Sequence, residues 1–62
     1  MIKVVVIDDN IPIADRIAKT IPWEELGCTV SAVAYDGLQG KNVIMLHQPD
    51  VIIIDVRMPA LS

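Results

Sequence analysis

The chain has 62 residues, of which 53% are hydrophobic, and its eight acidic and five basic residues give a formal net charge of −3. A chain of this length forms one small domain at most, with a marginal core. The basic residues stand singly, so no basic patch favours direct contact with nucleic acid. No apolar run approaches the roughly 18 to 20 residues of a membrane span, and the first ten residues do not form a secretory signal.

The only cysteine, Cys28, excludes an intrachain disulfide and is typical of proteins in a reducing compartment. We therefore expect a cytoplasmic protein without membrane contact.

Three apolar runs predict strands, at residues 2–7, 28–35 and 51–54. The first and third show no alternation of apolar and polar residues, which is typical of strands covered on both faces in a parallel sheet. The run at 28–35 alternates more, which indicates a strand at the edge of the sheet.

Residues 10–21 carry the signals of a helix. Asn10 is a favourable N-cap, Pro12 is tolerated in the opening turn, and Pro22 ends the helix near residue 20 or 21. Helical spacing predicts one apolar face, formed by Ile13, Ala14, Ile17, Ala18 and Ile21.

A second helix is predicted from the Asp36-Gly37 pair to residue 46 or 47, although Gly40 inside it costs about 1 kcal/mol relative to alanine. The order of elements is then strand, helix, strand, helix, strand. This alternation predicts an α/β fold, with right-handed crossovers and helices on the faces of a parallel sheet.

Acidic residues follow the first and third predicted strands. Asp8 and Asp9 end the run VVVIDD, and Asp55 ends the run VIIID. Ligands of open parallel sheets bind outside the carboxyl ends of the strands. If these two strands are neighbours, the three carboxylates meet in one shallow pocket, although each of them could also serve only in a turn or a helix cap.

Crowded carboxylates repel one another, and Mg²⁺, which prefers oxygen ligands, resolves that conflict. A carboxylate can also attack phosphorus to give an acyl phosphate, a step that a metal assists by screening charge. The pattern therefore indicates a Mg²⁺ site in which one aspartate is placed for phosphoryl transfer.

The motifs VVVIDDN, AYDG and PDVIIIDVRMP resemble the first half of a bacterial response-regulator receiver domain, and the similarity covers nearly all 62 residues. Receivers of this family take a phosphoryl group from a sensor histidine kinase onto an aspartate. The resemblance implies a flavodoxin-like fold of five parallel strands in the order 2-1-3-4-5. Residues 1–62 would supply strands one to three, in the order 2-1-3, and helices one and two.

Carried over by position, the resemblance makes Asp55 the phosphoacceptor and Asp9 a direct Mg²⁺ ligand. Asp8 holds the ion largely through water, and the backbone carbonyl of Arg57 completes the ligands from the protein. Asn10 stands where an acidic residue is commoner, and we expect this difference to tune the site. The domain is expected to accept a phosphoryl group rather than to act as an enzyme on other substrates.

The stretch IPWEELGCTVSAVAYDG is similar to receivers joined to an AraC-type DNA-binding module, so we expect the parent protein to be a transcription regulator. The resemblance also implies a Ser or Thr after strand four and a Lys after strand five, which bind the phosphoryl oxygens. Neither is among the 62 residues. We therefore expect a truncated half-domain that binds Mg²⁺ weakly, is phosphorylated slowly or not at all, and does not signal alone.

A strand at the edge of a sheet is a template for pairing with another chain. We therefore expect a homo-oligomer, most simply a two-fold dimer through residues 51–54, with a swapped arrangement as the alternative. A second functional hypothesis is a self-assembling structural fragment or interaction module without phosphotransfer activity. A haloacid-dehalogenase-type phosphatase is disfavoured, because its D-x-D nucleophile motif is absent.

Overall fold

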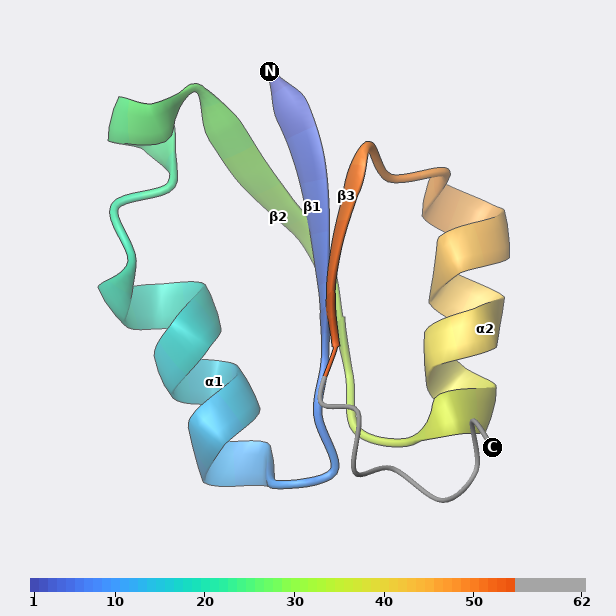
Figure 1. Ribbon diagram of the computed structural model, residues 1–62. Coiled ribbons are helices and arrows are strands. Elements are labelled where there is room, and N and C mark those ends of the chain that lie inside the picture. Colours follow the sequence, from blue (N-terminus) through green and yellow to red (C-terminus); the bar gives the residue numbers. More distant parts are fainter. Residues whose placement is uncertain (55–62) are drawn as a thin grey trace.

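The computed structural model describes residues 1–54 and contains one three-stranded sheet between two helices (Figure 1). The elements in chain order are β1 (Ile2–Ile7), α1 (Ile11–Thr20), the short 3-10 helix η1 (Glu24–Leu26), β2 (Cys28–Ala34), α2 (Gly37–His47) and β3 (Val51–Ile54). All strands are parallel, in the order β2-β1-β3. The predicted α/β fold, half of a flavodoxin-like sheet, is confirmed. No helix in this range is long and apolar enough to cross a bilayer.

The central strand β1 supplies the core on both faces of the sheet. Val5 and Ile7 pack with Ala34 on the side of α2, whereas Val4 and Val6 pack with Ala14 of α1. The four β1 side chains are at most 1% exposed. Successive side chains of a strand point to opposite faces, so one continuous apolar run fills two separate cores.

Helix α1 begins after Asn10 and ends at Thr20, as predicted, but its buried face is centred differently. Ala14 is fully buried against β1, whereas Ile13, which was expected on the apolar face, is 39% exposed. The prediction for Ile13 was therefore wrong. The small side chain of Ala14 is the one that faces the crowded valines of β1, and Ile13 lies one position away from that line of contact.

Helix α2 lies close to β1 because Gly40 has no side chain. Gly40 is buried, and a Cβ atom placed on it would lie 2.7 Å from Cδ1 and 3.0 Å from Cγ2 of Ile7. Such distances are shorter than ordinary van der Waals contact, so glycine at this position permits the close approach. The residue that weakens the helix prediction is the one that lets the helix pack.

Strand β2 is an edge strand, as expected, and ends at Ala34, one residue before the predicted end. The chain enters it through η1, which Trp23 anchors. The indole ring of Trp23 is half-buried in the core beside α1, and its Nε1–H donates to the carbonyl of Ile17 over 3.1 Å.

Strand β3 is held in register with β1 by two hydrogen bonds at its start. The backbone N–H of Lys3 donates to Oδ2 of Asp50 over 2.8 Å, and the N–H of Asp50 donates to the Lys3 carbonyl over 2.9 Å. The next residues then pair as Val4 with Val51, and the pairing continues to Ile7 and Ile54. This register determines which residues meet at the carboxyl end of the sheet.

Candidate functional site

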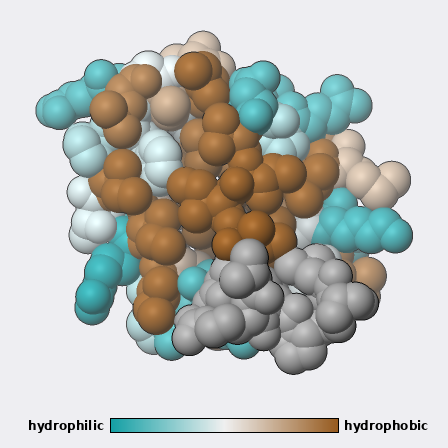
Figure 2. Space-filling model, viewed as in Figure 1, coloured by the Kyte–Doolittle hydropathy of each residue, from teal (hydrophilic) through white to brown (hydrophobic). Residues whose placement is uncertain are grey.

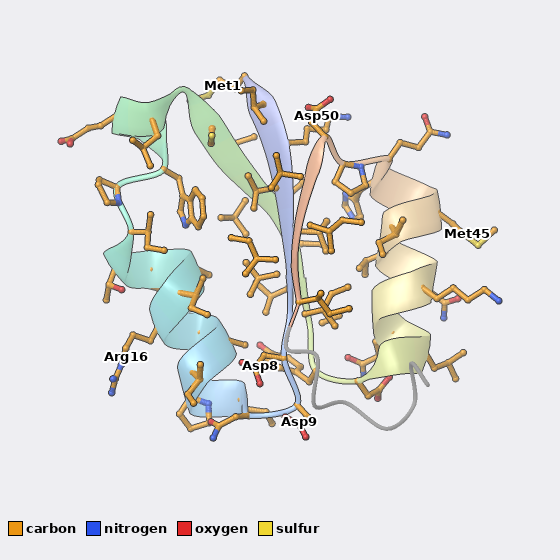
Figure 3. The ribbon with its side chains drawn as sticks, in the orientation of Figure 1. Met1, Asp8, Asp9, Arg16, Met45 and Asp50 are labelled. Carbon is orange, nitrogen blue, oxygen red and sulfur yellow. The ribbon has the colours of Figure 1, made fainter. Side chains whose placement is uncertain are left out.

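The two acidic strand ends that the sequence predicts as a site belong to neighbouring strands. β1 pairs with β3, and the last pair in the register is Ile7 with Ile54. Asp8 and Asp9 follow β1 directly and lie together at its carboxyl end, opposite the end that carries Met1 and Asp50 (Figure 3). Asp8 is only 5% exposed, whereas Asp9 is exposed.

Asp8 is held on both sides by backbone groups. Its own N–H donates to the Ala34 carbonyl over 3.1 Å, which continues the pairing of β1 with β2. Its Oδ1 accepts the N–H of Asn10 over 2.9 Å. A buried carboxylate is costly unless it is hydrogen-bonded or paired with a cation, so this bond orients Asp8 and offsets part of its burial.

Asn10 joins this carboxylate to the first turn of α1. Its side-chain Oδ1 accepts the N–H of Ile13 over 3.2 Å, and its carbonyl accepts the N–H of Ala14 over 2.9 Å. Asn10 is therefore the N-cap that the sequence predicts. The bond from its own N–H to Asp8 was not predictable from residue types, because it depends on the backbone turn after β1.

The acidic residue that follows β2 has a structural task. Asp36 caps α2, and its Oδ1 accepts the N–H of Gln39 over 2.7 Å. In return, Oε1 of Gln39 accepts the N–H of Tyr35 over 3.2 Å. This reciprocal arrangement resembles a capping box. It explains why the sequence has an acid at this strand end without adding that acid to the candidate metal ligands.

The remaining candidates, Asp55 and Arg57, lie outside the described residues. Within residues 1–54, no group of three or more His, Cys, Asp or Glu side chains could hold a metal ion. The described part of the site therefore consists of Asp8 and Asp9. Two adjacent carboxylates, one of them buried and oriented, fit the oxygen ligands that Mg²⁺ takes from proteins, usually one or two carboxylates completed by water and phosphate oxygens.

A second polar contact, missed by the sequence analysis, joins α1 to the residue after β2. The hydroxyl of Tyr35 donates to Oδ1 of Asp15 over 2.8 Å. This hydrogen bond to Asp15 raises the pKa of Tyr35 above its ordinary value of 10.0, and desolvation and the negative charge of Asp15 act in the same direction. No local pattern indicates this pair, because the two residues are 20 positions apart.

Comparison with known proteins agrees with this arrangement of parallel strands. Residues 4–62 match the response regulator receiver domain. An uncharacterized response regulatory protein of Staphylococcus epidermidis is 41% identical over 59 residues, which are 95% of this chain and 24% of that protein. The transcriptional regulatory protein HptR of Staphylococcus aureus is 37% identical over 59 residues, which are 95% of this chain and 23% of HptR. No solved structure matches the chain.

The chain belongs to the response regulator receiver domain family. It spans about a quarter of the length of these curated relatives. Membership implies a phosphoacceptor role in two-component signalling, because receiver domains accept a phosphoryl group. Receivers are in general not classical enzymes, they generally bind Mg²⁺ at the phosphorylation site, and response regulators typically interact with sensor histidine kinases.

Proposed function

We propose that residues 1–62 form the first part of a receiver domain in which Asp55 is the phosphoacceptor. The single observation that carries this proposal is the register of β1 and β3, which ends with Ile7 opposite Ile54. The sequence continues from these two residues with Asp8 and Asp55. Parallel strands that are neighbours in a sheet end at the same edge, so this register supports a shared site.

Asp8 and Asp9, together with Asp55 and the Arg57 carbonyl, are the proposed ligands of Mg²⁺. When bound, the ion supplies charge screening for the carboxylate and the incoming phosphoryl group. Asp8 contributes a carboxylate whose direction is set by the Asn10 N–H, and Asp9 contributes an exposed one. The oriented, buried Asp8 suits a ligand that acts through water, and Asp9 suits direct coordination.

In the proposed transfer, one carboxylate oxygen of Asp55 attacks the phosphorus of a phosphohistidine on a sensor kinase. The new P–O bond forms as the P–N bond breaks, and the imidazole leaves with the electron pair of that bond. Asp55 becomes an acyl phosphate. The similarity to HptR, which is described as a transcriptional regulatory protein, supports a role of the parent protein in transcription regulation. The further proposal of an AraC-type DNA-binding module in the parent protein rests on the stretch IPWEELGCTVSAVAYDG.

The test is phosphorylation of the full chain by a small phosphodonor in the presence of Mg²⁺, followed by intact mass measurement. We expect a slow, Mg²⁺-dependent gain of one phosphoryl group that is lost in Asp55→Asn. Glu25→Gln is the matched control, because it also replaces a carboxylate by an amide, at an exposed position of η1 away from the carboxyl ends of β1 and β3. A gain that persists in Asp55→Asn would contradict the assignment of the phosphoacceptor.

A second candidate function is self-assembly through β3, in the absence of phosphotransfer. Three of its four side chains, Val51, Ile52 and Ile54, are between 38% and 44% exposed. Among the residues that the structure describes, β3 pairs only with β1. Figure 2 shows apolar side chains gathered down the middle of this view, between the two helices, where β3 lies. A stable oligomer without any gain of phosphate would favour this function over the first.

A further inference from the structure

We propose that Asn10 is a positioning residue of the metal site, which orients Asp8 through its backbone N–H and limits the Mg²⁺ affinity through its uncharged side chain. This inference rests on the proposed function, because it concerns the same Mg²⁺ site. It assigns control of the Mg²⁺ affinity to Asn10 and predicts that an acidic residue at this position raises that affinity.

The orienting role follows from the three hydrogen bonds that fix Asn10. Its carbonyl and its side-chain Oδ1 accept the N–H groups of Ala14 and Ile13, so the residue is tied to the first turn of α1. Its N–H, fixed in direction by those two bonds, donates to Oδ1 of the buried Asp8. The cap of the helix and the orientation of the carboxylate therefore form one unit, and loss of the cap would disturb both.

The effect of the Asn10 side chain on the Mg²⁺ affinity follows from its position beside Asp9 and from its role as a helix cap. Asn10 is exposed and follows Asp9 directly in the chain. Its Oδ1 is committed to the Ile13 N–H, so the amide acts as a cap rather than as a third ligand. Asparagine and aspartate are equally good N-caps. Asn10→Asp therefore keeps the cap and adds one negative charge beside the two carboxylates.

The experiment measures Mg²⁺ binding to the full chain by titration calorimetry, with the amide NMR signal of residue 10 as a second readout. Asn10→Asp should raise the affinity by about three- to tenfold at low ionic strength, from the Coulomb attraction of one added charge. The gain should shrink to about twofold near physiological salt, where the screening length is about 8 Å. The signal of residue 10 should move with the same midpoint as the calorimetric titration, because its N–H contacts Asp8.

Asn42→Asp is the matched control, since it makes the same change at an exposed position of α2 and should leave the affinity unaltered. Asn10→Ala should lower both the melting temperature and the affinity, and Asn10→Ser should restore most of both, because serine can cap the helix. An equal affinity of Asn10→Asp and the unsubstituted chain at low salt would overturn this inference alone. Absence of any Mg²⁺ binding would overturn the proposed Mg²⁺ site and this inference with it.

Discussion

The hydroxyl of Tyr35 makes the one side-chain hydrogen bond between the end of β2 and α1 within the described residues, and its acceptor is the carboxylate of Asp15. That bond raises the pKa of Tyr35. A phenol whose pKa is higher in the folded than in the unfolded chain stabilises the fold below the ordinary pKa. The stabilisation is lost as the pH rises from the ordinary value of 10.0 through the raised value.

Asp15→Asn should therefore lower the pKa of Tyr35 toward its ordinary value, because the charge is removed and the amide oxygen accepts more weakly. The ultraviolet absorbance of the phenolate measures this pKa directly, since Tyr35 is the only tyrosine of the chain. Tyr35→Phe is the control: it should abolish the absorbance change and the associated loss of stability above pH 10.0. An unchanged titration curve in Asp15→Asn would show that the bond to Asp15 is not the cause of the raised pKa.

Residue types predicted the capping role of Asn10, because a cap is a local feature that extends over three residues. They placed the start of the second helix at Asp36-Gly37, but the cap that Asp36 forms was found only in the structure. The same reasoning could not predict the bond between Tyr35 and Asp15 or the N–H that orients Asp8. These contacts depend on where the fold places distant or backbone groups. The roles of Asp55 and Arg57 remain predictions, since these residues lie outside the described range.

At the scale of elements, the packing of α2 on β1 depends on Gly40. Gly40→Ala should lower the free energy of unfolding by about 1 kcal/mol, measured by urea denaturation. The added methyl group would collide with the buried side chain of Ile7, and overpacking of this kind costs about 1–3 kcal/mol. Replacing glycine inside a helix returns about 1 kcal/mol of helix propensity, which offsets part of that cost.

The contact with Ile7 can be tested by a second change. Ile7→Val removes Cδ1, the atom nearest to the added methyl group at 2.7 Å, but leaves two branches on Cβ. The combined variant should therefore lose less stability than the sum of the two single changes. If Gly40→Ala were as stable as the unsubstituted chain, Ile7 would have moved aside at little cost, and Gly40 would not be required for the packing.

The bounds of the three strands and of α1 and α2 were predictable to within about one residue, because caps, prolines and apolar runs mark them in the sequence. The short helix η1 was not predicted. The buried face of α1 was less predictable from the sequence. Hydrophobic spacing favoured Ile13 equally with its neighbours, whereas the packing selects Ala14. The register of β1 with β3 could not be predicted from the sequence either, since it depends on the hydrogen bonds between Lys3 and Asp50.

At the scale of the whole molecule, the exposed apolar edge of β3 leads us to expect self-association at micromolar concentration. Ile52→Lys should weaken it, because a charge on an edge strand opposes pairing with another chain. Sedimentation equilibrium of the full chain measures the effect. Leu26→Lys is the matched control, since Leu26 is 60% exposed in η1, which adjoins β2 at the other edge of the sheet. A monomeric unsubstituted chain would refute the expectation.

The central place of β1 also has a consequence for synthesis. β1 is synthesised before both of its neighbours. Val30, the partner of Val4 in β2, follows Val4 by 26 positions, and Val51, its partner in β3, follows it by 47 positions. At about 5–20 residues per second, the apolar segment Val4–Ile7 waits for several seconds before both neighbours have been made. During that interval these four side chains, which are at most 1% exposed after folding, remain open to water and to any chaperone that binds apolar segments.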